Sequence, residues 1–320
     1  MIKQKWLVFW VAILFTVSAA GGQNELSWAD WTQQLRQEAM ADGIRAEVFD
    51  RIFSDIPGPD QTILRFYNSQ PERRLTFLEY QRTRADNLRI ETGRQERQKY
   101  NDLLSAIDRD YGVDPAIVLA LWGLETNYGQ YLGSFSVPQS LATLAYGSNR
   151  PEFFRSELLK ALHILQDGQV SLPNFKGEWA GASGHPQFLP SSWYKYAVDY
   201  DHCGRKDIWT RIPDALASIA NYLAKNGWQP GQPWAVEVSL PDHFDSALIG
   251  KSIIKPVSAW RDLGVTANNH SWPDDSLPAS IIQLNGGPTL MIFKNFRVLQ
   301  TWNDSNYYVA TVVYLADQIE

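Results

Sequence analysis

The sequence predicts a mainly α-helical protein of the α+β class, with a small β-containing subdomain near the C-terminus. Apolar residues recur at helical spacing, with capping residues at helix starts, through the first two thirds of the chain. After Trp234 the pattern changes to short β-type runs separated by Pro, Gly, Asn and Asp. We therefore expect a helical region over residues 21–234, the β-containing subdomain over 235–300, and a C-terminal segment and helix over 301–320 that pack back on the helical region.

The expected elements follow one another closely. The first helix begins at Ser27, whose spacing from Asp30 is typical of a capping box. Arg and Glu alternate with apolar residues from Pro71 to Tyr111, which is typical of helices with a solvated face. Further helices are expected at 114–128, 138–146, 151–167, 191–199, 213–226 and 306–318, and strands at 235–240, 281–284 and 290–293.

The N-terminus has the pattern of an exported protein. Lys3 and Lys5 precede an apolar run over residues 6–17, which ends in the small residues Ser-Ala-Ala at 18–20. This order predicts a cleavable signal peptide over residues 1–20 and a periplasmic protein. The run is shorter than the roughly 20 apolar residues that a spanning helix needs, so we expect no stable membrane insertion. Gly21 stands where a lipoprotein would have cysteine, so no lipid anchor is expected.

Composition excludes several classes of function. Removing residues 1–20 deletes two lysines and no acidic residue, so the formal net charge changes from -6 to -8 and nucleic acid is a poor candidate partner. Cys203 is the single cysteine and the five histidines are scattered, so neither an internal disulfide nor a zinc site is expected. The 13 tryptophans and 14 tyrosines include candidates for stacking on sugar rings, although most are expected in the core.

Glu125 is the carboxylate with the most informative position. Asp114 is a suitable N-cap and Gly129 a suitable stop, so Glu125 falls in the last turn of a helix. Leu121 and Trp122 lie one turn before it, and burial together with the negative helix end predicts a raised pKa for Glu125. A carboxylic acid that stays protonated near neutral pH suits general-acid cleavage of a glycosidic bond.

Two segments carry a resemblance to a known family. Gly-Leu-Glu-Thr-Asn-Tyr-Gly at 123–129 and Gly-Glu-Trp-Ala-Gly-Ala-Ser-Gly-His-Pro-Gln-Phe-Leu-Pro-Ser-Ser at 177–192 resemble the lytic murein transglycosylase B family, glycoside hydrolase family 103, in a soluble form without a lipobox. The resemblance implies a lysozyme-like helical catalytic core. It also implies one catalytic glutamate at the end of a helix, and the matching residue is Glu125.

The same resemblance implies further residues that bind the substrate. Tyr80 matches a tyrosine that faces the scissile sugar, and Arg150 matches an arginine that contacts peptide or glycan. Gln187 matches a glutamine that hydrogen-bonds an acetamido group, and Tyr222 matches a second tyrosine of the cleft. Trp302 and Asn303 match a C-terminal aromatic-Asn segment, and Tyr308 matches the tyrosine that follows it. Glu178 is also expected among the substrate-binding residues; it stands where many relatives have serine, which places a second carboxylate in the motif.

The resemblance also extends to a calcium loop of the EF-hand type. Asp199, Asp201 and Asp207 occupy positions 1, 3 and 9 of that loop, and Gly204 occupies position 6. Position 5 is Cys203 and position 12 is Thr210, so an acidic ligand is missing at each. We therefore expect weak calcium binding or none, and no required cofactor.

The function implied by the resemblance is that of a peptidoglycan lytic transglycosylase. Glu125 would protonate the oxygen between N-acetylmuramic acid and N-acetylglucosamine, then accept the proton of the muramyl C6 hydroxyl as a 1,6-anhydro ring closes. Two alternatives stay open: a hydrolytic muramidase that uses Glu178 as a second carboxylate, and a non-catalytic peptidoglycan-binding protein. The expected partners are peptidoglycan glycan strands, with other cell-wall enzymes as candidates, and we expect a monomer.

Overall fold

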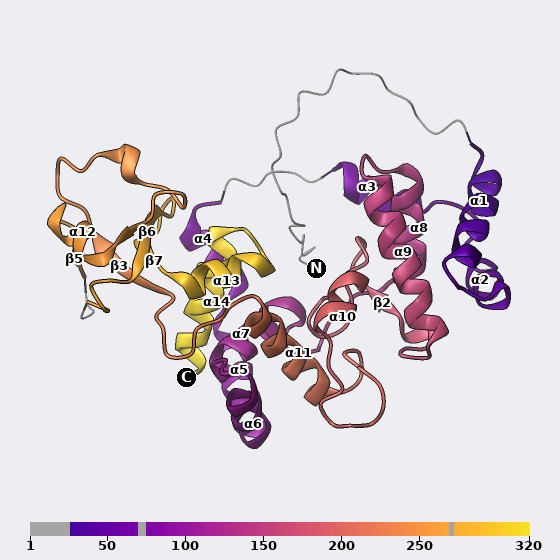
Figure 1. Cartoon of the computed structure of the whole chain (residues 1–320), viewed down its shortest axis with the longest axis horizontal. Helices are drawn as coiled ribbons and strands as arrows, with labels where there is room; N and C mark the ends of the chain where they lie inside the picture. The colour runs from indigo at the N-terminus through magenta and orange to yellow at the C-terminus, as the bar shows by residue number, and fades with distance from the viewer. Residues whose placement is uncertain (1–25, 70–74, 269–271) are drawn as a thin grey trace. The chain divides into compact units, whose positions relative to one another are not determined.

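The computed structural model describes residues 26–69, 75–268 and 272–320 (Figure 1). The predicted signal peptide lies outside these residues. The chain divides into two compact units, each built from two separate segments: residues up to 69 with 125–219, and residues 75–124 with 220–320. Among the described residues, no helix combines the length and apolar character needed to cross a bilayer.

The first unit is helical and is organised around one pair of helices. Helix α8 (Val137–Gly147) packs along α9 (Pro151–Gln166), and its core-facing residues, among them Leu141 and Leu144, are fully buried. The helices that pack around this pair are α1 (Trp28–Ala41), α2 (Ala46–Phe53), α3 (Gln61–Asn68) and α10 (Pro190–Tyr196). The expected cap is present at the first helix, because the Ser27 side chain accepts the Asp30 N–H.

A short strand pair interrupts the helices of the first unit. β1 (Phe135–Ser136) pairs antiparallel with β2 (Lys176–Gly177), with Phe135 opposite Gly177. A Cβ atom on Gly133 would lie 2.1 Å from the Gly177 carbonyl carbon, so the two backbones approach too closely for a side chain at Gly133. The pairing fixes the start of the 177–192 motif.

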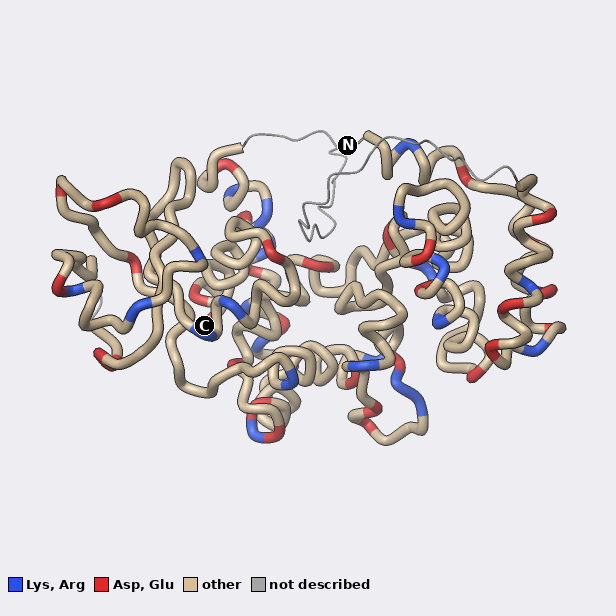
Figure 2. The backbone as a smooth tube through the Cα atoms, turned by 45° about the horizontal axis from the view of Figure 1, so that its top comes forward, with Lys and Arg blue, Asp and Glu red and all other residues tan. Residues whose placement is uncertain are grey.

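The second unit combines helices with a five-stranded antiparallel sheet. Its helices are α4 (Phe77–Arg84), α5 (Asn87–Lys99), α6 (Asn101–Tyr111), α12 (Val257–Asp262), α13 (Lys294–Trp302) and α14 (Asn306–Ile319), while α7 (Pro115–Thr126) and α11 (Ile212–Lys225) have residues in both units. The C-terminal helix α14 packs against α4, α5 and α13. Lys and Arg are interspersed with Asp and Glu along the helices of both units (Figure 2).

The sheet has the strand order β4-β6-β7-β3-β5. Its central hairpin is β6 (Pro278–Gln283) with β7 (Thr289–Ile292), in which Ile281 lies opposite Met291. β3 (Ala235–Ser239) pairs with the other edge of β7, and β4 (Lys255–Pro256) and β5 (Thr266–Ala267) are short edge strands. Edge strands of two residues expose few unpaired backbone groups.

One face of the sheet is covered by Trp260 of α12. Its side chain is fully buried with Val236, Ile281 and Met291, and its indole N–H donates to the Ala279 carbonyl at 3.1 Å. The hydrogen bond satisfies the polar atom that burial would otherwise leave without a partner. This cluster gives the sheet its own hydrophobic core.

The predicted mainly α fold with a small β-containing part is confirmed. The predicted helices at 114–128, 138–146, 151–167, 191–199, 213–226 and 306–318 are present, with ends shifted by a few residues. The two-residue strands β1 and β2 and the helix α12 were not predicted, because segments this short have no hydrophobic period. The sequential domain boundaries remain a prediction, since the compact units are built from non-sequential segments.

Replacing Trp260 by alanine should lower the free energy of unfolding by about 3–5 kcal/mol, because a buried indole and its hydrogen bond are both lost. Urea unfolding followed by circular dichroism measures this. Leu263→Ala is the matched control: the side chain lies just after α12 and is 41% exposed, so its loss should cost about 0.5 kcal/mol or less. Equal losses in the two variants would contradict the core assignment.

Candidate active site

Helix α7 carries Glu125 in its last turn, as predicted. The Asp114 carboxylate accepts the Ala116 N–H at 2.8 Å and so caps the start of the helix. The helix ends at Thr126, one residue after Glu125. Glu125 is buried, with 8% of its surface exposed. A carboxyl group is therefore held at the end of a helix and away from bulk water.

The chain turns sharply directly after Glu125. Asn127, Tyr128 and Gly129 all have left-handed backbone conformations, with φ of 52°, 58° and 81°. A Cβ atom on Gly129 would lie 2.3 Å from the His185 ring, so glycine is required there both by conformation and by this close approach. The Thr126 hydroxyl also donates to the His185 carbonyl at 3.2 Å. The His185 segment thus fixes the turn that ends α7.

Glu178 follows β2 in the same unit and lies in a tight turn. Its N–H donates to the Ala182 carbonyl at 2.8 Å, and its carbonyl accepts the Gly181 N–H at 2.9 Å. Burial raises the pKa of Glu178 to about 7, and the negative charge of Glu125 adds to the effect. Two carboxyl groups of the 123–129 and 177–192 motifs therefore interact electrostatically.

Gln187 is held in place by its side-chain amide. The Nε2 group donates to the carbonyls of Gly184 at 2.9 Å and Leu132 at 3.3 Å. Its Oε1 atom is buried and has no hydrogen-bond partner among the described residues. A buried acceptor without a hydrogen bond lowers the free energy of unfolding, because its desolvation is not compensated. Gln187 therefore has one buried acceptor for which the described residues supply no donor.

Arg150 lies at the start of α9 and is exposed. Its guanidinium carbon lies 4.2 Å from the centre of the Phe153 ring, and its N–H donates to the Ser148 hydroxyl at 3.1 Å. The guanidinium keeps its hydrogen-bonding edges toward solvent in a stacked arrangement of this kind.

The other predicted substrate-binding residues lie in the second unit. Tyr80 is half-buried on α4, where its ring packs edge-on against Tyr307 at 5.9 Å and beneath the Arg84 guanidinium. Tyr307 belongs to α14 and was not singled out in the sequence. Its place beside Tyr308 was the only signal available.

A second aromatic group of that unit joins α11 and α13. The rings of Tyr222 and Trp302 lie 4.7 Å apart at 65°, and the Tyr222 hydroxyl donates to the Thr301 carbonyl. Asn303 ends α13, and its side chain accepts the Ser305 N–H at 3.0 Å. Tyr308 is buried in the first turn of α14. The structure thus brings Tyr222, Trp302 and Asn303 together within their unit.

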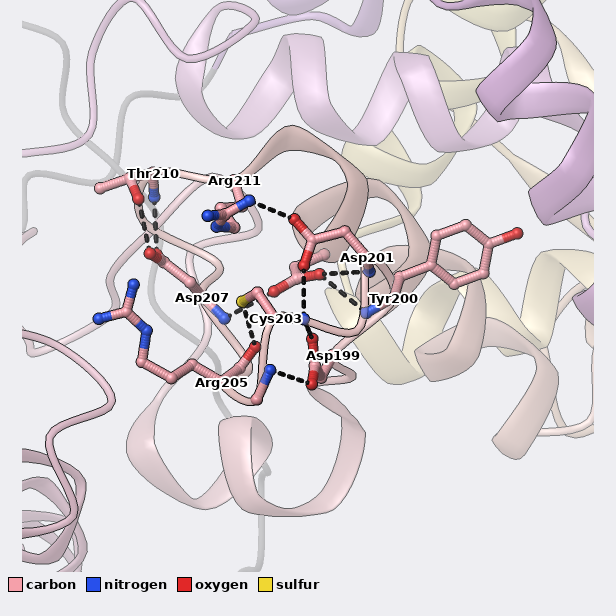
Figure 3. Close-up of polar contacts among 10 residues, drawn as sticks. Asp199, Tyr200, Asp201, Cys203, Arg205, Asp207, Thr210 and Arg211 are labelled. Atoms are coloured by element: carbon pink, nitrogen blue, oxygen red, sulfur yellow. Dashed lines mark hydrogen bonds and ion pairs between the residues drawn. The ribbon is translucent and has the colours of Figure 1, made fainter.

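The EF-hand-like loop lies between α10 and α11 in the first unit (Figure 3). Asp199 and Asp201 do lie together there. Asp207 faces away from them, because its carboxylate accepts the N–H groups of Trp209 and Thr210 and the Thr210 hydroxyl. The third carboxylate of the cluster is Asp214.

Asp214 lies in the first turn of α11, beyond the 12 residues of an EF-hand-type loop that begins at Asp199. Its ligand atom lies within 4.8 Å of those of Asp199, Asp201 and Cys203. Calcium prefers about six to eight oxygen ligands and a bidentate acid at position 12. Cys203 offers a thiol at position 5, and the Thr210 hydroxyl at position 12 is hydrogen-bonded to Asp207. The cluster is compact, but its residues are not the oxygen ligands of an EF-hand.

The family follows from comparison with known proteins. Residues 27–317 match the family model described as the transglycosylase SLT domain. The chain belongs to this family. It is 32% identical over 230 residues to the membrane-bound lytic murein transglycosylase B of Escherichia coli strain K12; the match covers 69% of this chain and 61% of that protein. The chain therefore spans about three fifths of the length of this relative.

Solved structures that include lytic transglycosylases share the fold. SltB3 from Pseudomonas aeruginosa, in complex with NAG-NAM-pentapeptide, superposes with a TM-score of 0.88 at 41% identity, covering 92% of this chain and 79% of that one. The Escherichia coli lytic transglycosylase Slt35 in complex with calcium superposes with a TM-score of 0.80 at 27% identity, covering 90% and 92%. The predicted lysozyme-like helical core is confirmed.

Glu178 should make stability depend on pH between about 4.5 and 7. Its pKa is higher in the folded state than the ordinary value of 4.5, so its stabilising contribution is complete at low pH and is lost as pH rises through about 7. Between pH 4 and pH 8, the free energy of unfolding of Glu178→Gln should therefore rise by about 2–3 kcal/mol relative to that of the parent.

Urea unfolding of both proteins across this range measures the difference. Glu47→Gln, at an exposed position of α2, should follow the parent at every pH. Parallel curves for Glu178→Gln and the parent would show that burial of Glu178 is not coupled to its protonation.

Proposed function

We propose that this chain is a peptidoglycan lytic transglycosylase that cleaves the bond between N-acetylmuramic acid and N-acetylglucosamine with Glu125 as its acid and base. The observation that carries the proposal is the burial of Glu125 at the end of α7, in a chain of the transglycosylase SLT domain family. SltB3, at 41% identity, has been captured with NAG-NAM-pentapeptide and with NAG-anhNAM-pentapeptide. The second of these ligands has the anhydro sugar that the proposed reaction forms.

The reaction needs one carboxyl group in two roles. Protonated Glu125 donates its proton to the glycosidic oxygen, the bond from that oxygen to the muramyl C1 breaks, and N-acetylglucosamine leaves with a free hydroxyl. The Glu125 carboxylate then takes the proton of the muramyl C6 hydroxyl as that oxygen bonds to C1. Glu125 ends in its starting state, and no water is consumed.

Gln187 supports recognition of an N-acetylated sugar. Its buried Oε1 has no partner among the described residues, and an acetamido N–H is a donor that would satisfy it. Arg150, on the same unit, would meet an anionic peptide or glycan group. The family resemblance supports glycan contacts for Tyr80, Tyr222, Trp302, Asn303 and Tyr308 as well. Periplasmic location, a monomeric state and contacts with other cell-wall enzymes belong to the same proposal.

One observation favours a second candidate function. The charge of Glu125 acts on Glu178, so two carboxyl groups are available, and a hydrolytic muramidase needs a pair of this kind. The two functions differ in product: hydrolysis leaves reducing muramic acid, which is heavier than the anhydro form by one water. Mass spectrometry of digested sacculi decides between them, and Glu178→Ser should leave anhydro product formation intact.

Glu125→Gln should lower the rate of glycan release from purified sacculi by at least about 100-fold, because the general acid is lost. Glu47→Gln is the control for loss of a carboxylate at an exposed site in the same unit and should cleave at the parent rate. If Glu125→Gln cleared sacculi as fast as the parent, the catalytic assignment would be wrong. If the parent bound sacculi without cleaving them, the chain would be a binding protein.

Gln187→Ala should weaken glycan binding by about tenfold, the usual value of one hydrogen bond to a buried group. The measurement is titration of N-acetylated glycan strands in the Glu125→Gln background, which prevents turnover. On de-N-acetylated strands the two proteins should differ much less. An equal loss on both kinds of strand would mean that Gln187 does not read the acetamido group.

A further inference from the structure

The loop between α10 and α11 brings Asp199 and Asp201 close to Asp214 of α11, and N–H groups of the protein donate hydrogen bonds to all three carboxylates (Figure 3). The Asp199 carboxylate accepts the N–H groups of Cys203 at 2.9 Å and Gly204 at 2.8 Å. The Asp214 carboxylate is fully buried and accepts the N–H groups of Tyr200 and Asp207, each at 2.8 Å. Asp214 also lies in the first turn of α11, where the helix dipole favours a negative charge.

Asp201 has a full positive charge as its partner. Its Oδ2 atom accepts from the Arg211 guanidinium at 2.6 Å, and its Oδ1 atom accepts the Cys203 N–H at 3.1 Å. Arg211 directly precedes α11, and its carbonyl accepts the Ala215 N–H at 3.1 Å, so its backbone is fixed by the helix. The guanidinium thus joins the two ends of the loop, which is what a bound cation does in a metal-binding loop.

The far end of this loop reaches the turn after Glu125 through contacts within the first unit. The Ile208 carbonyl accepts the His185 N–H at 2.9 Å, and the Trp209 indole donates to the Ser183 hydroxyl at 3.2 Å. The His185 carbonyl in turn accepts the Thr126 hydroxyl, and its ring packs against Gly129. A displacement of the loop would therefore displace the end of α7.

We propose that Arg211 is the built-in cation of this loop, so that the loop holds the Glu125 end of α7 in place without calcium. Arg211 acts through Ile208 and His185 and is a positioning residue. Its effect on catalysis rests on the proposed function, whereas metal independence and the stability of the loop do not.

The first test is the response of the full chain to calcium. Thermal unfolding in excess EDTA and in millimolar CaCl₂ should give the same Tm, and calorimetric titration with CaCl₂ alone should give no binding heat. A calcium-dependent rise in Tm of several degrees, or saturable binding of calcium, would overturn the proposal. This test needs no variant, so it stands even if a substitution in the loop prevents folding.

The second test removes the charge of Arg211. In EDTA, Arg211→Gln should lower Tm by at least about 2 °C, because the aspartates lose their counter-charge, and Arg211→Lys should keep most of the stability. Lys251→Gln is the control for loss of an ion pair outside the loop: Lys251 lies 2.7 Å from Asp304 and is about as exposed as Arg211, although Asp304 is more exposed than Asp201. If Arg211→Gln lost no more than this control, Arg211 would not be the cation of the loop.

Cleavage of sacculi supplies a readout that separates positioning from stability. The parent should cleave at the same rate in EDTA and in calcium, and Arg211→Gln, assayed well below its Tm, should lower kcat severalfold with KM nearly unchanged. An unchanged kcat would overturn the positioning role. A parent that cleaves nothing in either buffer would defeat the proposed function, while the calcium and unfolding results would still decide the metal independence of the loop.

Discussion

The rest of the site depends on how helix α7 is stopped one residue after Glu125. Three consecutive left-handed residues, Asn127 to Gly129, turn the chain at a point where the His185 ring leaves no room for a side chain on Gly129. A left-handed conformation is costly for residues other than glycine, so tertiary contacts have to hold it. The Thr126 hydroxyl bond to the His185 carbonyl supplies one of these contacts, and the turn keeps Glu125 at a buried helix end.

His185 can serve as this support because it is neutral. Burial lowers its pKa to about 4, and the nearby charge of Asp207 only partly opposes the effect. An uncharged ring can pack against the backbone at Gly129 without bringing a positive charge close to Glu125. The same segment continues into Gln187, whose side-chain amide donates to the Gly184 carbonyl and whose Oε1 is buried without a partner among the described residues.

The carboxyl groups of Glu178 and Asp201, both in the first unit, have pKa values shifted in opposite directions. Among the described residues no positive charge offsets the burial of Glu178, and burial together with the charge of Glu125 raises its pKa to about 7. Desolvation acts to raise the pKa of Asp201, but hydrogen bonds from Cys203 and from the Arg211 guanidinium hold that pKa below its usual value. A buried carboxyl group with a raised pKa makes stability depend on pH, whereas an ionised aspartate paired with an arginine is suited to holding a loop.

The sequence by itself determined the features that depend on neighbours a few residues apart. The Asp114 cap and the stop at Gly129 place Glu125 at a helix end, and short β-type runs between Pro, Gly, Asn and Asp predict the three longest strands of the sheet. Tertiary structure alone decided which distant groups meet: the charge of Glu125 acting on Glu178, and Asp214 in place of Asp207 beside the other aspartates. Residue spacing along a chain determines local geometry. Contacts between distant segments depend on how helices and strands pack, and a short sequence motif does not determine that packing.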